Sequence, residues 1–153
     1  MQMLVIGVDP GGQETGIVLR DGNEVITGIL LRRLRSDSLA DYLAEHVRCL
    51  KDLRSTYGDD IAIVCETITV PSPHVRVIAV QGLLDTQFLI GGLCVAFPGL
   101  ILVEPSGHGS QPLFSYPSSL VGPRERVGAG RFRHLRSAFD VGAASYVLVG
   151  NGR

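Results

Sequence analysis

The sequence predicts one α/β domain over residues 1–153, in which helices flank a mixed β-sheet in the order βββαβαβα. Apolar, β-branched runs alternate with segments that repeat at helical spacing, and the first three runs follow one another through short turns. The chain is 45% hydrophobic, so it can bury one substantial core. It is too short for two ordinary domains.

The first part of the chain predicts a three-stranded meander. Residues 3–9 are apolar and β-branched and stop at the turn Pro10-Gly11-Gly12, which indicates a first strand. Residues 15–20 and 24–30 predict two further strands, because Asp21-Gly22-Asn23 between them is typical of a hairpin turn.

The middle of the chain predicts a helix, a strand and a second helix. Ser38 with Asp41 resembles a capping box, and apolar residues recur behind it at helical spacing, so an amphipathic helix is expected at about 37–56. Residues 61–66 predict a short strand. Residues 75–95 predict a long helix that is apolar on most of its circumference, and we expect it to be buried against its sheet and against another subunit.

The last part of the chain predicts one more strand and a closing helix. The strand is expected at residues 100–104, and the helix at 133–150 carries the small residues Gly142, Ala143 and Ala144. Residues 105–130 between them are rich in Gly, Pro and Ser, which predicts a long irregular segment. Segments of this length in compact domains are usually functional or mobile.

Several classes of protein are not expected. The three cysteines show no C-x-x-C spacing and no histidine at ligand spacing, which argues against a zinc site and a disulfide framework. No signal peptide is visible, and polar residues interrupt the longest apolar stretch, 75–97, so a membrane span is not expected. We expect a cytoplasmic protein.

The basic residues are concentrated, although the net charge is only −1. Such a charge argues against a generally basic, nucleic-acid-binding surface, but a local patch is compatible with phosphate binding. One stretch of 13 residues holds a single acid, Glu125, and five of the chain's arginines: Arg124, Arg126, Arg131, Arg133 and Arg136. A solvated loop is the alternative interpretation.

Three acids stand at positions that favour a metal site. Asp9 and Glu66 each lie at the C-terminal end of a predicted strand, where sites of open α/β sheets form. Asp140 lies on the last helix in an otherwise apolar setting. Carboxylates suit Mg²⁺, and two such ions can activate water and stabilise a leaving oxygen in phosphodiester hydrolysis.

Each acid also has an ordinary structural explanation. Asp9 precedes Pro-Gly and is a common turn residue, and Glu66 is placed to pair with an arginine. Asp140 is compatible with an acid near a helix N-terminus, where the helix dipole favours negative charge. Spacing alone does not decide between these explanations and a shared site.

The opening segment resembles a known motif. Val5-Ile6-Gly7-Val8-Asp9-Pro10-Gly11, followed by Thr15-Gly16, resembles the first motif of the RuvC-type Holliday-junction resolvases, in the RNase H-like superfamily. Glu66 stands where that family carries its second acid, and Asp140, followed by small residues, resembles its last acid. Helix 75–95 falls where such enzymes dimerise, and Glu104-Pro105-Ser106 resembles the strand end that follows. Order and spacing match over almost the whole chain, as in a compact, phage-type member.

The resemblance implies an RNase H-like fold and a homodimeric, Mg²⁺-dependent endonuclease, with Mn²⁺ as a substitute. It implies that Asp9, Glu66 and Asp140 hold two ions and that metal-activated water attacks a phosphodiester. The implied substrate is branched DNA, above all a four-way junction, which is cut by paired nicks. The dimer would form through helix 75–95, and the protein would act in the bacterial cytoplasm, as a cellular or a phage protein.

Two departures concern the site. The family usually has a fourth ligand one helical turn before the last acid, where this chain has Ser137. His134 is the other candidate, but it lies about 240° around a regular helix from Asp140 and would reach the site only if the helix began later than expected. The family also places lysines before the last helix, and this chain has none there.

The expected DNA contacts therefore rest on other residues. Arg124, Arg126 and His108 are the candidates for the role of the lysines, and Arg131 and Arg133 extend the same surface. The loop 67–74 follows Glu66 and would face DNA. Relatives often carry an aromatic wedge there, whereas here the candidates for DNA contact are Ile68 and His74, with Val70 as a further apolar wedge and loop packing as the alternative.

Other functions remain open. A related RNase H-like nuclease would act on flaps, forks or RNA–DNA hybrids. A catalytically impaired junction-binding protein would bind without cutting. An actin-like ATPase or sugar kinase shares the opening pattern but needs a second comparable half, for which the chain is too short.

Overall fold

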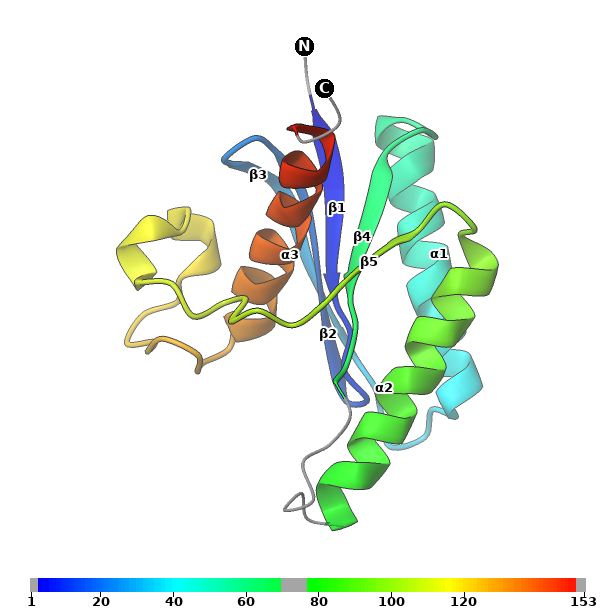
Figure 1. The fold of residues 1–153 in the computed structure, drawn as a ribbon. Helices are drawn as coiled ribbons and strands as arrows, with labels where there is room; N and C mark the ends of the chain where they lie inside the picture. Colours follow the sequence, from blue (N-terminus) through cyan, green and yellow to red (C-terminus); the bar gives the residue numbers. More distant parts are fainter. Residues whose placement is uncertain (1–2, 70–76, 151–153) are drawn as a thin grey trace.

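The computed structural model describes residues 3–69 and 77–150. The elements follow the predicted order βββαβαβα (Figure 1). The strands and helices are β1 (Leu4–Asp9), β2 (Glu14–Asp21), β3 (Glu24–Arg32), α1 (Leu39–Tyr57), β4 (Ala62–Glu66), α2 (Val77–Ala96), β5 (Ile101–Val103) and α3 (Arg133–Gly150). The expected irregular segment before α3 contains the 3₁₀ turns η1 (Leu113–Ser115) and η2 (Ser118–Leu120).

Local interactions explain why two element boundaries differ from the predicted ones. Helix α1 begins at Leu39 because Ser38 is its N-cap, with a hydroxyl that accepts a hydrogen bond from the Asp41 amide at 3.0 Å. Strand β3 continues to Arg32, which lies opposite Glu14 of β2 and forms a 2.7 Å salt bridge with it.

The sheet is mixed, as predicted, with the strand order β3-β2-β1-β4-β5. The first three strands pair antiparallel, whereas β1 pairs parallel with β4, and β4 pairs parallel with β5. In the register of β1 and β4, Val8 lies opposite Cys65. The next residues, Asp9 and Glu66, therefore end neighbouring strands at the same edge of the sheet.

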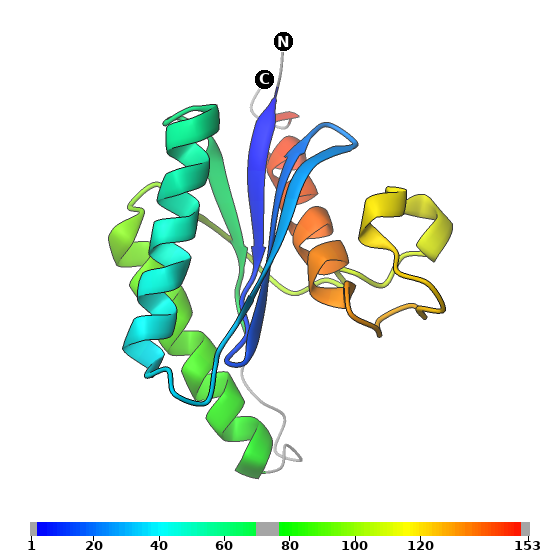
Figure 2. The same cartoon turned by 180° about the vertical axis from the view of Figure 1, so that it is seen from behind.

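Helices cover both faces of the sheet. Helices α1 and α2 lie on one face and α3 lies on the other (Figures 1 and 2). Because side chains alternate along a strand, Ile6 and Val8 of β1 enter the core beneath α1 and α2, while Val5 packs against α3. Among the described residues, no helix combines the length and the apolar character needed to cross a membrane.

Two glycines allow α3 to lie directly against the strands. A Cβ atom on Gly7 would stand 1.9 Å from the Ala138 carbonyl oxygen, and one on Gly16 would stand 2.1 Å from the His134 carbonyl oxygen. Gly16 is the partner of Asp9 in the β1–β2 register. The first turn of α3 is therefore held beside the end of β1.

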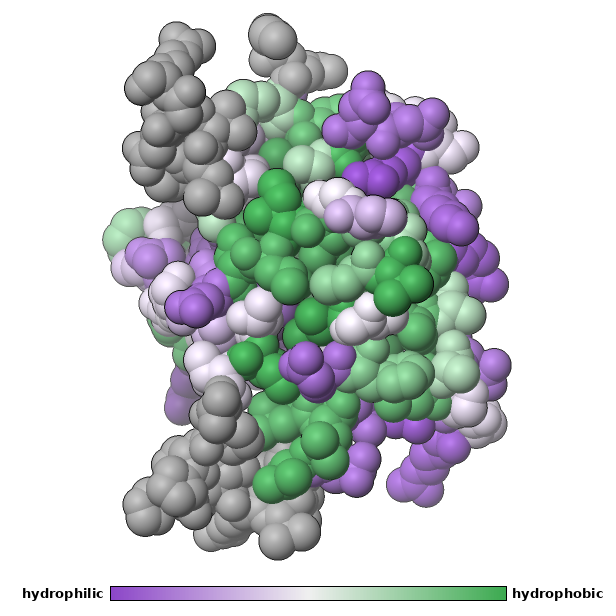
Figure 3. Space-filling view, turned by 45° about the vertical axis from the view of Figure 1, so that its right-hand side comes forward, coloured by the Kyte–Doolittle hydropathy of each residue, from purple (hydrophilic) through white to green (hydrophobic). Residues whose placement is uncertain are grey.

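Helix α2 is only half buried. Leu89 and Leu93 pack into the core, but a stripe of apolar residues along the same helix remains exposed. Its members are Val80, Leu84, Phe88 and Val95. Figure 3 shows a broad apolar area on this side of the molecule.

Candidate active site

Asp9 and Glu66 form the centre of the candidate site. Burial raises the pKa of the Glu66 carboxyl and the negative charge of Asp9 raises it further, while a hydrogen bond from His108 acts in the opposite direction. Two adjacent, partly buried carboxylates repel one another and favour a bound cation. Their placement is the one that the strand ends predict.

Each carboxylate is held by an imidazole. The Nδ1 atom of His134 lies 2.9 Å from Asp9 Oδ2, and the Nδ1 atom of His108 lies 2.5 Å from Glu66 Oε2. Glu66 thus has a histidine partner rather than the arginine that was the alternative. The other nitrogen of His108, Nε2, lies 3.2 Å from Ser106 Oγ, so this imidazole is held from both sides.

His134 reaches Asp9 without a later start of the last helix, contrary to our expectation. Helix α3 begins at Arg133, as predicted, and His134 is its second residue. The expectation assumed that a ligand must share the helix face of Asp140. The contact instead forms because the first turn of α3 lies against Gly16, beside the end of β1.

A turn docked on α3 places His108. Gly107 and Gly109 flank it with φ angles of 72° and 82°, a left-handed conformation that favours glycine. A Cβ atom on Gly109 would also stand 3.1 Å from the Ser137 amide nitrogen. Gly109 therefore holds this turn close to α3, and Ser137, a candidate ligand, packs beneath it.

Asp140 is bound to the same turn. Its Oδ2 atom accepts a hydrogen bond from the Gly109 amide at 2.7 Å and another from the Tyr116 hydroxyl at 2.6 Å. Asp140 is the eighth residue of α3, so a role as an acid of the first helical turn does not apply. Within residues 3–69 and 77–150, no group of three His, Cys, Asp or Glu side chains is arranged to hold a metal ion.

A buried polar network supports the turn after Asp9. The Thr15 hydroxyl lies 2.7 Å from His46 Nε2 and accepts a hydrogen bond from the Gly11 amide at 3.2 Å. The Tyr42 hydroxyl donates to the Gly11 carbonyl at 3.1 Å. Burial lowers the pKa of His46, which favours the neutral imidazole. Sequence reasoning missed this network, whose only signal was the i, i+4 spacing of Tyr42 and His46.

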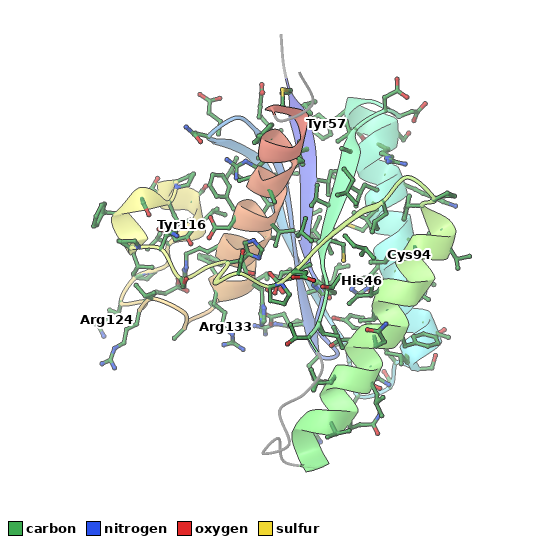
Figure 4. All side chains as sticks on the ribbon, viewed as in Figure 1. His46, Tyr57, Cys94, Tyr116, Arg124 and Arg133 are labelled. Carbon is green, nitrogen blue, oxygen red and sulfur yellow. The ribbon has the colours of Figure 1, made fainter. Side chains whose placement is uncertain are left out.

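The arginine-rich stretch is divided between the surface and the interior. Arg136 is fully buried and pairs with Glu125, and it also donates to the carbonyls of Leu120 at 3.0 Å and Ala129 at 2.6 Å. The predicted DNA contacts are instead exposed: Arg124, Arg126, Arg131 and Arg133. Figure 4 shows Arg124 and Arg133 on the same side of the sheet as α3.

The loop after Glu66 is described only in part. Ile68 is partly buried and packs against the core beneath α1 and α2, which agrees with the packing alternative. The Thr67 amide donates to the Val103 carbonyl at 2.8 Å and continues the pairing with β5. His74 and Val70 lie outside the described residues.

The residues fit a divalent cation at the strand ends. Asp9 and Glu66 supply hard oxygen ligands, and burial together with the neighbouring Asp9 charge raises the pKa of Glu66, so a bound cation would stabilise both carboxylates. Mg²⁺ usually keeps several water ligands and needs only one or two protein carboxylates. Two carboxylates beside two imidazoles therefore satisfy the chemistry of such a site.

No protein-family model matches the sequence, and no curated protein matches it. Two solved structures are similar over almost their full length. T. thermophilus RuvC in complex with a Holliday junction substrate has a TM-score of 0.67, 13% identity, and coverage of 98% of this chain and 97% of that chain. A second Thermus thermophilus RuvC structure has a TM-score of 0.61, 16% identity and 97% coverage of both chains. The predicted fold is thus confirmed, and the chain has a RuvC-type, RNase H-like fold.

Proposed function

We propose that this protein is a metal-dependent DNA endonuclease that resolves four-way junctions by paired nicks. The observation that carries the proposal is the pair of carboxylates, Asp9 and Glu66, at neighbouring strand ends of a RuvC-type fold. One of the similar structures is a complex with a Holliday junction substrate, and this supports a four-way junction as the substrate.

In this proposal Asp9 and Glu66 hold Mg²⁺, or Mn²⁺ as a substitute, with two ions in each site. The bound ions would supply activated water and stabilise the leaving oxygen of the phosphodiester. His134 and His108 each hold one oxygen of a carboxylate, and this contact orients Asp9 and Glu66.

Asp140 is the third proposed ligand, with His134 or Ser137 as the fourth. Both hydrogen bonds that Asp140 accepts from described residues use Oδ2, and Oδ1 takes no part in them. Ligation through Oδ1 would therefore leave the contacts to Gly109 and Tyr116 in place.

DNA would lie across the strand ends and the exposed arginines. Arg124, Arg126, Arg131 and Arg133 are proposed to contact phosphates, since each is exposed and none has an acidic partner among the described residues. His108 and His74 complete the proposed contacts, whereas Ile68 packs against the core. Binding through such a local patch should weaken as salt concentration rises.

A homodimer through helix 75–95 completes the proposal. The exposed apolar stripe on α2 faces away from the core, and contact with a second copy of the chain would remove it from water. A two-fold dimer places two sites on a junction that is itself nearly two-fold symmetric. Sedimentation at micromolar concentration should give about twice the 16.4 kDa chain mass, and Leu84→Glu should give a monomer.

Cleavage of synthetic DNA tests the function. The chain should nick a four-way junction symmetrically in Mg²⁺, and Asp9→Asn and Glu66→Gln should abolish nicking while folding and junction binding persist. Asp59→Asn, an exposed carboxylate, is the matched control. Equal cleavage by Asp9→Asn and the parent would refute the metal site.

The choice of substrate separates the alternatives. Three-way, flap, fork, RNA–DNA hybrid and linear duplex substrates are compared with the junction, with and without Mg²⁺. Preferred cleavage of flaps, forks or hybrids would identify a related nuclease of another specificity. Tight junction binding without any product would identify a junction-binding protein.

A further inference from the structure

The turn η1 presents a phenylalanine to solvent. Phe114 is 91% exposed, more than any other large hydrophobic side chain in the described part of the chain. Single exposed apolar residues are ordinary on protein surfaces. Phe114 differs because hydrogen bonds of the neighbouring residues fix the backbone on both sides of it.

Hydrogen bonds within the turn fix its backbone, and one further hydrogen bond attaches it to α3. The Ser115 amide donates to the Pro112 carbonyl at 2.9 Å, and the Ser115 hydroxyl donates to the same oxygen at 2.6 Å. Tyr116 is buried, and its hydroxyl donates to Asp140 and accepts from the Gln111 amide at 3.2 Å. Phe114 therefore meets a partner from a preformed turn, which lowers the entropy lost on binding.

The turn is connected to the candidate site by a short chain of contacts. The Asp140 oxygen that binds Tyr116 also binds the Gly109 amide, and Gly109 follows His108, the partner of Glu66. Figures 1 and 2 place η1 on the side of α3, across the sheet from α2. A dimer through α2 would thus leave Phe114 accessible.

The charge around the turn favours a nucleic acid as the partner. From residue 105 to residue 132 the only acid is Glu125, and its carboxylate forms an ion pair with the buried Arg136 and accepts hydrogen bonds from two backbone amides. The exposed side chains of the same segment include Arg124, Arg126 and Arg131. A segment with an exposed aromatic ring, exposed arginines and no exposed acid is typical of surfaces that bind nucleic acid.

We propose that Phe114 stacks on a base at the branch point of the junction, and this inference rests on the proposed function. Bases at a branch can be unstacked, so one face is free to accept an aromatic ring. In a continuous duplex both faces of each base are already covered by its neighbours. The contact would therefore distinguish branched from linear DNA, while the arginines bind phosphates of both.

Binding to a four-way junction and to a linear duplex, measured without Mg²⁺, tests the proposal. Phe114→Ala and Phe114→Leu should weaken junction binding about tenfold, since stacking on an aromatic contributes this order of affinity. Duplex binding should change less than about twofold. Phe114→Tyr keeps the ring and should bind like the parent. Tyr57→Ala removes an exposed aromatic at the far end of α1 and is the matched control (Figure 4).

A fluorescent base analogue at the branch point gives a second measurement. Its fluorescence should be quenched by the parent and by Phe114→Tyr, but not by Phe114→Leu. Unchanged junction binding and unchanged quenching in Phe114→Ala would overturn the inference while leaving the proposed function in place. A parent protein that binds junction and duplex equally would also overturn the inference, whereas a failure to nick the junction in Mg²⁺ would overturn the proposed function.

Discussion

Removing the charge of Glu125 should destabilise the fold, because this carboxylate neutralises a buried arginine. Arg136 is fully buried, and its Nε atom has no hydrogen-bond partner among the described residues. Glu125 also accepts hydrogen bonds from the amides of Gly122 at 3.0 Å and Phe132 at 2.9 Å. Glu125→Gln keeps the shape of the side chain but leaves the guanidinium without a counter-charge.

The expected loss follows from the burial of the pair. Breaking a buried ion pair by removing one partner lowers the free energy of unfolding by about 3–5 kcal/mol. For a chain of this length each kcal/mol corresponds to about 2–4 °C, so the Tm should fall by about 6–20 °C. Exposed pairs contribute only about 0–1 kcal/mol, so Arg32→Gln, which breaks an exposed pair, is the matched control.

Urea and thermal unfolding measure the difference, and a double-mutant cycle identifies its cause. Arg136→Met removes the buried charge, so Glu125→Gln combined with Arg136→Met should be more stable than Glu125→Gln alone. A loss below about 1 kcal/mol in Glu125→Gln, or a double variant that is no more stable, would refute the reasoning.

Three further predictions concern stability and DNA binding. Gly16→Ala should lower the free energy of unfolding by more than about 2 kcal/mol, because its Cβ would meet the α3 backbone. Gly28→Ala is the control, since the nearest contact of its Cβ is at 3.5 Å, and it should have a much smaller effect in urea unfolding. Arg124 has a φ of 61°, a strained conformation for a residue with a side chain, so Arg124→Gly should raise the Tm. The same change removes a proposed phosphate contact and should weaken DNA binding. A lower Tm would contradict the backbone strain, and unchanged affinity would contradict the phosphate contact. Burial lowers the pKa of His46 in the folded state, so the unfolded chain takes up the proton first, and the free energy of unfolding should fall as pH drops below about 6.5. Titration of the His46 imidazole by NMR at an ordinary pKa would contradict that prediction.

The placement of Asp9 and Glu66 could be predicted because it depends on strand direction alone. Both acids end apolar runs, and two parallel neighbours bring such ends together. The helix from Arg133 was predicted for the same kind of reason, since its periodicity is local. Patterns within one element are readable because few other residues influence them.

The partners of these acids could not be predicted, because they depend on packing between distant segments. The contact of His134 with Asp9 joins residues 125 positions apart and requires the close approach that Gly16 permits. The contact of His108 with Glu66 requires a turn with two left-handed glycines that docks on α3. Nothing in the sequence distinguished Arg136 from the four exposed arginines of the same stretch.

The segment before α3, which contains the turn of His108 and the turn η1, links the candidate metal site to the candidate DNA surface. Asp140 binds both the turn that carries His108 and the tyrosine that anchors η1, so a single carboxylate fixes a group beside Glu66 and the turn that presents Phe114. Loosening this segment from α3 would therefore disturb the candidate metal site and the candidate DNA surface together. Tyr116→Phe removes the hydroxyl that binds Asp140 but keeps the buried ring, so it should lower junction affinity and cleavage together. Loss of cleavage with unchanged junction affinity would show instead that the two regions are independent.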